Sequence, residues 1–202
     1  MLNFRAIGFD YSGVIAGQPG FMGGVANLLG VPLAELKEIY FQHNRLKNVD
    51  GVPHDELWKI ILGKIKREEK SAEVLAYITA KQKQVCINTN MIELIDRLRS
   101  LGYKTGLLSN NDLEAAAKMR HDELDRHFDA MVVSAEVGYQ KPSPEIFNLF
   151  IEKLEVRANE LLFVDDSEQS LSLSKEIGFY PVHFKNYDDL VKTLAALVVL
   201  TD

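Results

Sequence analysis

Four short polar stretches follow apolar runs, and their side chains are of the kinds that bind phosphate and divalent metal ions. They are Asp10 with Ser12, Ser109 with Asn110, Lys141, and Asp165 with Asp166. Carboxylate oxygens are the ligands that Mg²⁺ prefers in proteins. A hydroxyl group and the backbone amides at the start of a helix can receive phosphate oxygens, and a lysine supplies a fixed positive charge. The set predicts a magnesium-dependent site for phosphate chemistry.

Asp10 has the chemistry of a nucleophile in that site. Its carboxylate can attack phosphorus and form an aspartyl-phosphate. Because side chains alternate along a strand, Asp10 and Ser12 share one face while Tyr11 points to the other.

Each stretch also has an ordinary structural explanation. Asp10 could end a strand at a turn, Ser109-Asn110 could cap a helix, and Lys141 could be solvated before a helix. The Asp165-Asp166 pair is harder to explain in this way, because it directly follows the buried run Leu-Leu-Phe-Val and needs a cation nearby. Four such stretches at four strand ends favour one common site.

The elements that position these residues are short apolar runs of the β type. The runs are Arg5–Asp10, Lys104–Ser109, Ala130–Ser134, Leu161–Asp165 and Tyr180–Phe184. The first and fourth are almost continuously apolar, as expected of strands buried on both faces of a parallel sheet. Helical periods separate the runs, for example Met91–Leu101 and the helix that Ser143-Pro144-Glu145 begins. We therefore predict an α/β fold with a doubly wound, Rossmann-like parallel sheet of five strands, whose carboxyl ends carry the site.

One segment interrupts this alternation. Residues 17–87, here called the helical lobe, contain helical periods around Leu33–Tyr40, Leu57–Ile65 and Val74–Ile78, with turn-rich stretches such as Gly17–Gly24 between them. We expect the helical lobe to be a cap domain. Residues 1–16 and 88–202 then form the core domain, with hinges near residues 15–20 and 86–90.

The composition narrows the classes of partner and location. The 202 residues are 47% hydrophobic and carry a net charge of −6, which argues against nucleic-acid binding. The apolar stretch Leu190–Leu200 is too short to span a bilayer and is expected to be a docked helix. The single cysteine, Cys86, is expected to be buried, and it fits a reducing, cytoplasmic location, as does the lack of a secretory signal pattern.

The four stretches together resemble the haloacid dehalogenase (HAD) superfamily, in the family's order and with similar separations. They read Gly8-Phe9-Asp10-Tyr11-Ser12-Gly13-Val14, Gly106-Leu107-Leu108-Ser109-Asn110, Gly138-Tyr139-Gln140-Lys141-Pro142-Ser143-Pro144-Glu145 and Phe163-Val164-Asp165-Asp166-Ser167. Within the helical lobe, the stretch from Asp50-Gly51 to Glu56-Leu57-Trp58 is similar to the caps of the family's phosphatases.

The resemblance implies a role for each site residue. Asp10 would be the nucleophile and a Mg²⁺ ligand, and the Ser12 carbonyl would be a second ligand. Lys141 would neutralise Asp10 and the phosphoryl charge. Ser109 and Asn110 would bind the phosphoryl group, and Asp165 and Asp166 would hold the metal.

Ser12 departs from the family's phosphatases, which commonly have an aspartate there as general acid and base. A serine hydroxyl is too weak an acid to replace this aspartate, so we expect a substrate whose leaving group needs little protonation. We predict a Mg²⁺-dependent phosphatase for a small phosphorylated metabolite, of the sugar phosphate, acyl phosphate or aryl phosphate type. The alternatives are a 2-haloacid dehalogenase, or a phosphate- or partner-binding protein with weakened catalysis.

Within the helical lobe, His43 is expected to be packed and His54 to be exposed.

Overall fold

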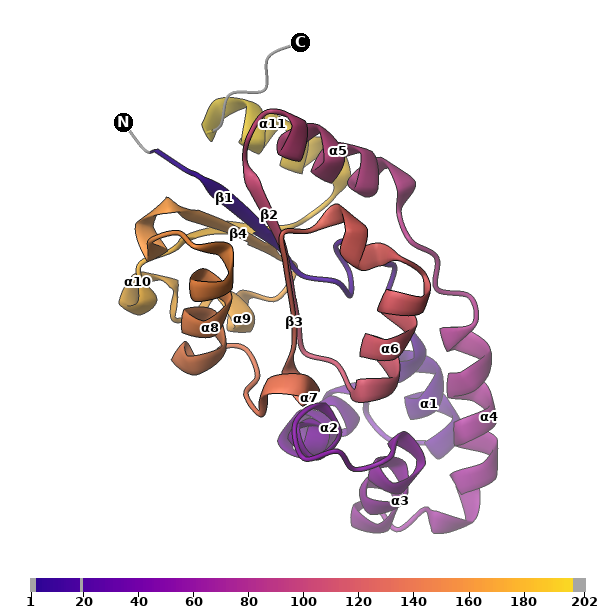
Figure 1. Cartoon of the computed structure of the whole chain (residues 1–202). Helices are drawn as coiled ribbons and strands as arrows, with labels where there is room; N and C mark the ends of the chain where they lie inside the picture. Colours follow the sequence, from indigo (N-terminus) through magenta and orange to yellow (C-terminus); the bar gives the residue numbers. More distant parts are fainter. Residues whose placement is uncertain (1–2, 19, 198–202) are drawn as a thin grey trace.

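The computed structural model describes residues 3–18 and 20–197 and contains the predicted parallel sheet of five strands (Figure 1). The strand order is β3-β2-β1-β4-β5, and every neighbouring pair is parallel. The strands are β1 (Ala6–Phe9), β2 (Lys104–Ser109), β3 (Ala130–Val133), β4 (Leu161–Asp165) and β5 (Tyr180–His183). The prediction of a doubly wound α/β fold is confirmed.

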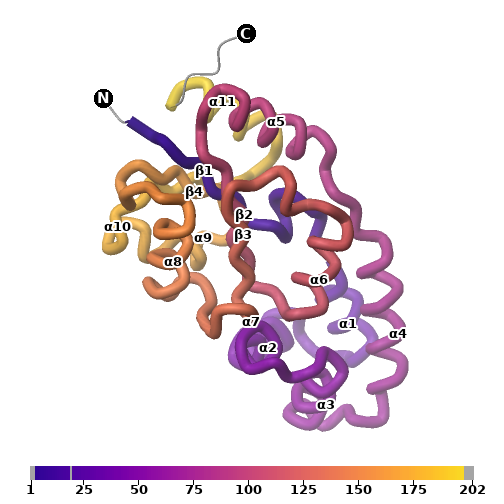
Figure 2. Tube along the Cα trace, viewed as in Figure 1, coloured from indigo at the N-terminus to yellow at the C-terminus, as the bar shows by residue number. Residues whose placement is uncertain are grey.

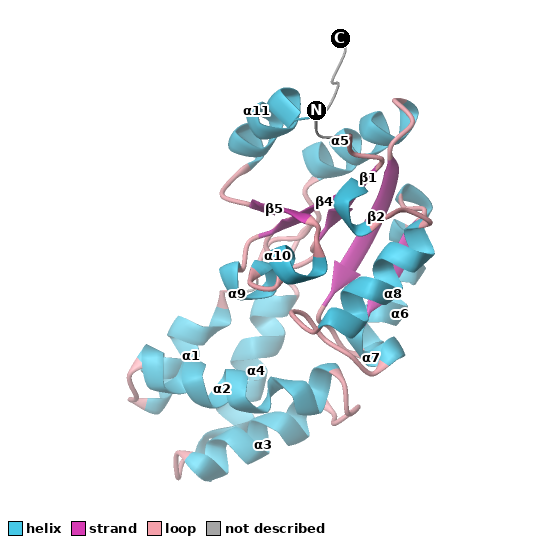
Figure 3. Ribbon diagram, turned by 90° about the vertical axis from the view of Figure 1, so that its left-hand side faces the viewer, coloured by secondary structure: helices cyan, strands magenta, loops and turns pink. Residues whose placement is uncertain are grey.

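Helices cover both faces of the sheet, which forms the middle of three layers (Figure 3). One apolar cluster joins the strands to α5 (Thr89–Ser100), α6 (Leu113–His121), η2 (Leu124–His127) and α11 (Tyr187–Leu197). A second cluster, on the opposite face, joins them to α8 (Pro144–Leu154), α9 (Glu168–Leu171) and α10 (Ser174–Ile177). Two short elements complete the core, α7 (Ser134–Val137) and η3 (Ala158–Glu160). The central strands are buried on both sides, as their continuous apolar runs predict.

The predicted helix starts and ends are close to those observed. Gly102, with φ of +90°, follows α5 as the predicted stop. Pro144 is the first residue of α8, and Ser143 precedes it at the N-cap position. Within the described residues, however, the Ser143 hydroxyl makes no capping hydrogen bond. The C-terminal helix α11 docks through Leu190 and Leu194, and the predicted continuation to Leu200 lies outside the described residues.

Residues of the helical lobe form four helices beyond the carboxyl ends of the strands, away from the chain termini (Figure 1). They are α1 (Phe21–Leu29), α2 (Leu33–Asn48), α3 (His54–Lys64) and α4 (Ser71–Gln82), with η1 (Glu68–Lys70) before α4. Their buried side chains form an apolar cluster of their own around Trp58 and Leu62. The chain enters this group of helices after β1 and returns to the sheet through α5 (Figure 2).

The helix α1 differs from the sequence-based expectation of a turn-rich stretch over Gly17–Gly24. Gly23 and Gly24 lie inside this helix despite their low helix propensity. Packing explains Gly24, because a Cβ atom there would overlap the ring and hydroxyl of Tyr77 on α4. Close approach of two helices therefore outweighs local propensity in this segment.

Two lengths of chain connect the sheet to the helical lobe, and they run side by side. The Asn88 N–H donates to the Ile15 carbonyl at 2.8 Å, and the Gly17 N–H donates to the Cys86 carbonyl at 3.1 Å. Cys86 is exposed in this connection, so the expectation that it is buried is wrong. Cys86 itself belongs to none of the apolar clusters, although its neighbour Ile87 packs against the cluster on one face of the sheet. Among residues 3–18 and 20–197, no helix has both the length and the apolar character needed to cross a membrane.

Two facing glycines let an aromatic ring approach the middle of the sheet. Gly8 of β1 pairs with Gly106 of β2, and the Phe150 ring of α8 lies over both. A Cβ atom on Gly106 would lie 2.5 Å from the Phe150 ring, and one on Gly8 would lie 2.7 Å from it.

We predict that Gly106→Ala lowers the free energy of unfolding by about 1–3 kcal/mol, because the added methyl group overpacks the core. Urea denaturation of purified protein measures this change. Gly23→Ala is the matched control, since a Cβ atom at Gly23 of α1 meets nothing within 4 Å. The control should be neutral or slightly stabilising. Equal stability of Gly106→Ala and wild type would contradict the packing described here.

Candidate active site

A buried lysine lies at the centre of the predicted site. The Lys141 Nζ atom is 2.8 Å from Asp10 Oδ1 and 2.6 Å from Asp165 Oδ2. Lys141 is only 4% exposed, and its ammonium group also lies 5.3 Å from the centre of the Phe163 ring. The loop after α7 thereby connects to the ends of β1 and β4 through two charged hydrogen bonds.

Three carboxylates come together beside Lys141. Asp10 directly follows β1, Asp165 ends β4 and Asp166 comes next, and they offer oxygen atoms that all lie within 4.8 Å of one another. When all are ionised, the three carboxylates and the Lys141 ammonium leave two net negative charges, which a divalent cation would balance. An all-oxygen donor set of this kind fits Mg²⁺. The predicted metal-ligating carboxylates are therefore close enough together to share one ion.

Burial and charge shift the pKa values of these groups. Burial raises the pKa of Asp10 to about 6, and the charge of Asp165 adds to the rise while Lys141 opposes it. Burial also raises the pKa of Asp166, again with a contribution from Asp165. For Lys141, burial disfavours the charged amine, but the Asp10 and Asp165 carboxylates outweigh this and raise its pKa. The raised pKa values of Asp10 and Asp166 indicate that Lys141 alone does not balance the negative charge of the three carboxylates.

The turn after β1 comes close to Asp166. Gly13 has a φ of +89°, and a Cβ atom there would overlap the Asp166 carboxylate. The Gln18 side chain, at the entry to the helical lobe, donates to Asp166 Oδ2 at 2.5 Å. Ser12 lies in the same turn, is half-buried, and pairs with Ala16 through an isolated β-bridge. Its hydroxyl has no hydrogen-bond partner among the residues that the structure describes.

The two residues predicted to bind a phosphoryl group have different surroundings. Ser109 ends β2, is 1% exposed, and its Oγ atom accepts a hydrogen bond from Asn111 Nδ2 at 2.9 Å. The Asn110 amide instead bonds the main chain of Lys141 twice. Its Nδ2 donates to the Lys141 carbonyl at 2.9 Å, and its Oδ1 accepts from the Lys141 N–H at 2.7 Å. The Asn110 side chain therefore fixes the loop that carries Lys141.

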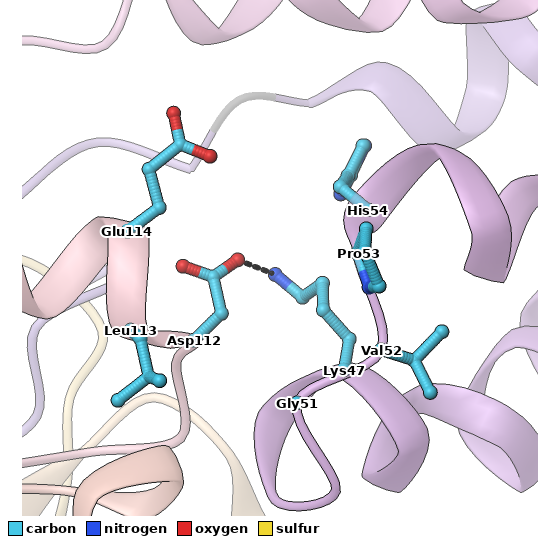
Figure 4. Close-up of a pocket in the computed structure, with 8 residues that line it drawn as sticks. All are labelled: Lys47, Gly51, Val52, Pro53, His54, Asp112, Leu113 and Glu114. Carbon is cyan, nitrogen blue, oxygen red and sulfur yellow. Dashed lines mark hydrogen bonds and ion pairs between the residues drawn. The ribbon is translucent and has the colours of Figure 1, made fainter.

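An ion pair joins the helical lobe to the core beside this site. The Nζ atom of Lys47, at the end of α2, lies 3.0 Å from Oδ2 of Asp112, the N-cap residue of α6 (Figure 4). The pair lines a cavity of about 170 Å³, together with His54 and Glu114. A larger cleft of about 690 Å³ continues from these residues between the helical lobe and α6, and Asn111 forms part of its wall.

The histidines of the helical lobe differ in their surroundings. His43 is half-buried, as expected for a packed side chain, and its Nδ1 atom lies 2.8 Å from the Ile39 carbonyl. The expectation that His54 is exposed is wrong. Both of its ring nitrogens are buried, with no hydrogen-bond partner among the described residues, because the helical lobe folds against the core at this point.

Sequence reasoning missed several of these contacts. Lys47 gave no signal, because its partner Asp112 lies far away in the sequence. Gln18 gave none for the same reason. Asn111 carried a weak signal, since an asparagine two residues after a site hydroxyl can bond it locally.

A parallel α/β sheet with a buried lysine and three carboxylates at its strand ends defines an enzyme-like centre for charged substrates. The sequence matches the family model for haloacid dehalogenase-like hydrolases over residues 4–176. The chain belongs to this family of hydrolases, which confirms the resemblance that the four motifs indicate.

Curated relatives include enzymes of different activities. Bifunctional epoxide hydrolase 2 of Mus musculus is 29% identical over 113 residues, which are 54% of this chain and 20% of that protein. Glyceraldehyde 3-phosphate phosphatase of Pyrococcus abyssi is 32% identical over 57% of this chain and 49% of that enzyme. (S)-2-haloacid dehalogenase 4A of Burkholderia cepacia is 30% identical over 50% of this chain and 44% of that enzyme. The match spans about a fifth of the epoxide hydrolase and under half of the other two relatives.

Solved structures support the fold. A HAD family enzyme of Bacteroides thetaiotaomicron, in complex with magnesium and inorganic phosphate, superposes with a TM-score of 0.65 at 19% identity. The similarity covers 93% of this chain and 99% of that one, so it includes residues of both the sheet and the helical lobe.

The half-buried His54, whose ring nitrogens are shielded from solvent, predicts a loss of stability in acid. Burial, and then the charge of Lys47, lowers its pKa from 6.5 to about 4. An unfolded chain takes up a proton at this histidine below pH 6.5, whereas the folded protein does not until about pH 4. The free energy of unfolding should therefore fall between these pH values.

Urea denaturation at pH 7 and pH 5 measures this fall, and His54→Asn should reduce it. His121→Asn is the matched control for loss of a histidine, because the His121 side chain is 90% exposed. An identical pH dependence in wild type and His54→Asn would contradict the buried, neutral His54.

Proposed function

We propose that the chain is a Mg²⁺-dependent phosphatase for a small phosphorylated metabolite of the sugar phosphate, acyl phosphate or aryl phosphate type. The cluster of Asp10, Asp165 and Asp166 carries this proposal, because its oxygen atoms lie within 4.8 Å of one another and the single charge of Lys141 does not balance three ionised carboxylates. The phosphatase among the relatives and the solved neighbour with magnesium and phosphate support it.

In this proposal Asp10 attacks the phosphorus atom, the bond between phosphorus and the oxygen of the alcohol or acid breaks, and an aspartyl-phosphate forms as that alcohol or acid leaves. Water then hydrolyses the intermediate and releases phosphate. Lys141 favours the ionised form of Asp10 and balances negative charge on the phosphoryl group. Asn110 holds the main chain of Lys141 in place. The Ser109 hydroxyl donates a hydrogen bond to a phosphoryl oxygen.

The proposed Mg²⁺ ligands are Asp10, Asp165, Asp166 and the backbone carbonyl of Ser12. When bound, Mg²⁺ would balance the charge of the phosphoryl group and of the carboxylates.

We further propose that the helical lobe is a cap that closes over the strand ends. The two paired connections at Ile15 and Asn88 would serve as its hinge, and the Lys47–Asp112 pair also joins the two parts. Closure would keep bulk water away from the aspartyl-phosphate.

Haloacid dehalogenase chemistry is the second candidate, since Ser12 supplies no acid and a halide ion needs no proton. The dehalogenase among the relatives favours it. It leaves the third carboxylate, Asp166, without a role, because dehalogenation requires no Mg²⁺.

Phosphate release from a panel of small phosphate esters tests the proposed function. Activity should require Mg²⁺, disappear with EDTA and return when Mg²⁺ is restored. Asp10→Asn should abolish it at an unchanged melting temperature, because an amide cannot attack phosphorus. Chloride release from a 2-chloro acid in the presence of EDTA would establish the dehalogenase instead. Absence of both activities would favour a phosphate- or partner-binding protein.

Ser12 predicts a preference for good leaving groups. A missing general acid costs about 100- to 10,000-fold in rate, and the cost grows with the basicity of the departing oxygen. Acyl, aryl and sugar 1-phosphates should therefore be faster substrates than simple alkyl phosphates. The dependence of kcat/KM on leaving-group pKa measures this, and Ser12→Asp should flatten it. A flat dependence in the wild type would mean that another residue donates the proton.

A further inference from the structure

Asn111 lies between the site residue Ser109 and the buried Ser134. Its side-chain Nδ2 atom donates to Ser109 Oγ at 2.9 Å. Its backbone N–H donates to Ser134 Oγ at 3.0 Å, and its carbonyl accepts from the Ala135 N–H at 3.2 Å. Hydrogen bonds therefore hold both the backbone N–H and the carbonyl of Asn111. Its side chain points to the Ser109 hydroxyl, which would bind a phosphoryl group.

The contact with Ser109 decides which role that hydroxyl can take. A serine hydroxyl has one proton to donate and two lone pairs to accept with. Because the Asn111 amide donates to Ser109 Oγ, it occupies a lone pair and leaves the proton for an acceptor elsewhere. Ser109 is 1% exposed, so solvent does not compete for that proton. Ser109 ends β2, the neighbour of β1, which Asp10 follows, so a phosphoryl oxygen bound beyond these strand ends would be that acceptor.

We propose that Asn111 is a positioning residue that sets Ser109 as a hydrogen-bond donor toward the phosphoryl group. This inference rests on the proposed phosphatase function and adds a residue to it. Asn111 acts through Ser109, so its loss should matter only while the Ser109 hydroxyl is present.

Ser134 holds Asn111 in this position and also contacts the helical lobe. Its fully buried hydroxyl lies 2.7 Å from the Asn48 carbonyl at the end of α2, and 3.0 Å from the Asn111 carbonyl. The orientation of Asn111 is thus defined by the sheet and by the helical lobe together. Asn111 also lines the large cleft, so direct contact with substrate is the competing explanation.

A double-mutant cycle separates these two explanations. The variants are Ser109→Ala, Asn111→Ala and the double substitution, with Asn148→Ala on the exposed side of α8 as the control for loss of an asparagine. The probe is inorganic phosphate, whose dissociation constant is measured by calorimetry with Mg²⁺ present. Values of kcat and KM and the melting temperature are measured alongside.

Asn111→Ala should weaken phosphate binding about 10-fold, the size of one hydrogen bond to a charged group. The double variant should be no weaker than Ser109→Ala. Asn111→Asp should weaken binding at least as much as Asn111→Ala, because a carboxylate accepts the Ser109 proton. The melting temperature should stay near that of wild type, and Asn148→Ala should match wild type in every measurement.

Additive losses in the double variant would overturn the inference and establish direct contact of Asn111 with the ligand. Wild-type binding by Asn111→Asp would overturn it as well, since the Ser109 proton would then not be needed. If wild type neither binds phosphate nor releases it from any ester, the proposed function fails, and the inference fails with it. Additive losses in an active phosphatase overturn the inference alone.

Discussion

The ammonium group of Lys141, buried between Asp10 and Asp165, is the interaction on which the rest of the site depends. A cation that is 4% exposed is stable only where carboxylates and hydrogen bonds replace its water. Removing one partner would leave an uncompensated buried charge. The two ion pairs also require β1 and β4 to be neighbours, because Asp10 directly follows β1 and Asp165 ends β4. The order of the strands therefore determines which carboxylates balance the charge of Lys141.

The sequence predicted the charged part of this arrangement because each residue ends a buried apolar run. Interpreting the runs as parallel strands placed Asp10 and Asp165 at one edge of the sheet, and the pairing of β1 with β4 brings them together there. The helix α1 could not be predicted in this way, because the reason for Gly24 is the ring of Tyr77 on another helix. The burial of His54 was missed for a related reason, since it depends on how the helical lobe meets the core.

The asparagines after β2 show a finer limit of sequence reasoning. Motif resemblance implies that Asn110 binds the phosphoryl group, which stays a prediction, and it gave no sign that the side-chain amide bonds the main chain of Lys141 across 31 positions of sequence. Asn111 in turn bonds Ser109, two residues away, and Ser134, which is 23 residues away. Which amide faces which partner depends on the turn between β2 and α6, and neighbouring residues of the same type cannot be distinguished by pattern.

The two antiparallel connections at Ile15 and Asn88 have a consequence for how this architecture can vary. The chain leaves the sheet and returns to it at residues that hydrogen-bond each other, so the whole insertion is a loop with joined ends. The entropy of closing such a loop rises only slowly with its length, by roughly 0.6 kcal/mol for each doubling. The strands β1 and β2 pair directly with each other, from Ala6 with Lys104 to Phe9 with Leu107, although the whole helical lobe lies between them in the sequence. An insertion of another size or shape could therefore replace this one at little cost to the sheet, so the helical lobe can vary while the carboxylate cluster at the strand ends stays the same.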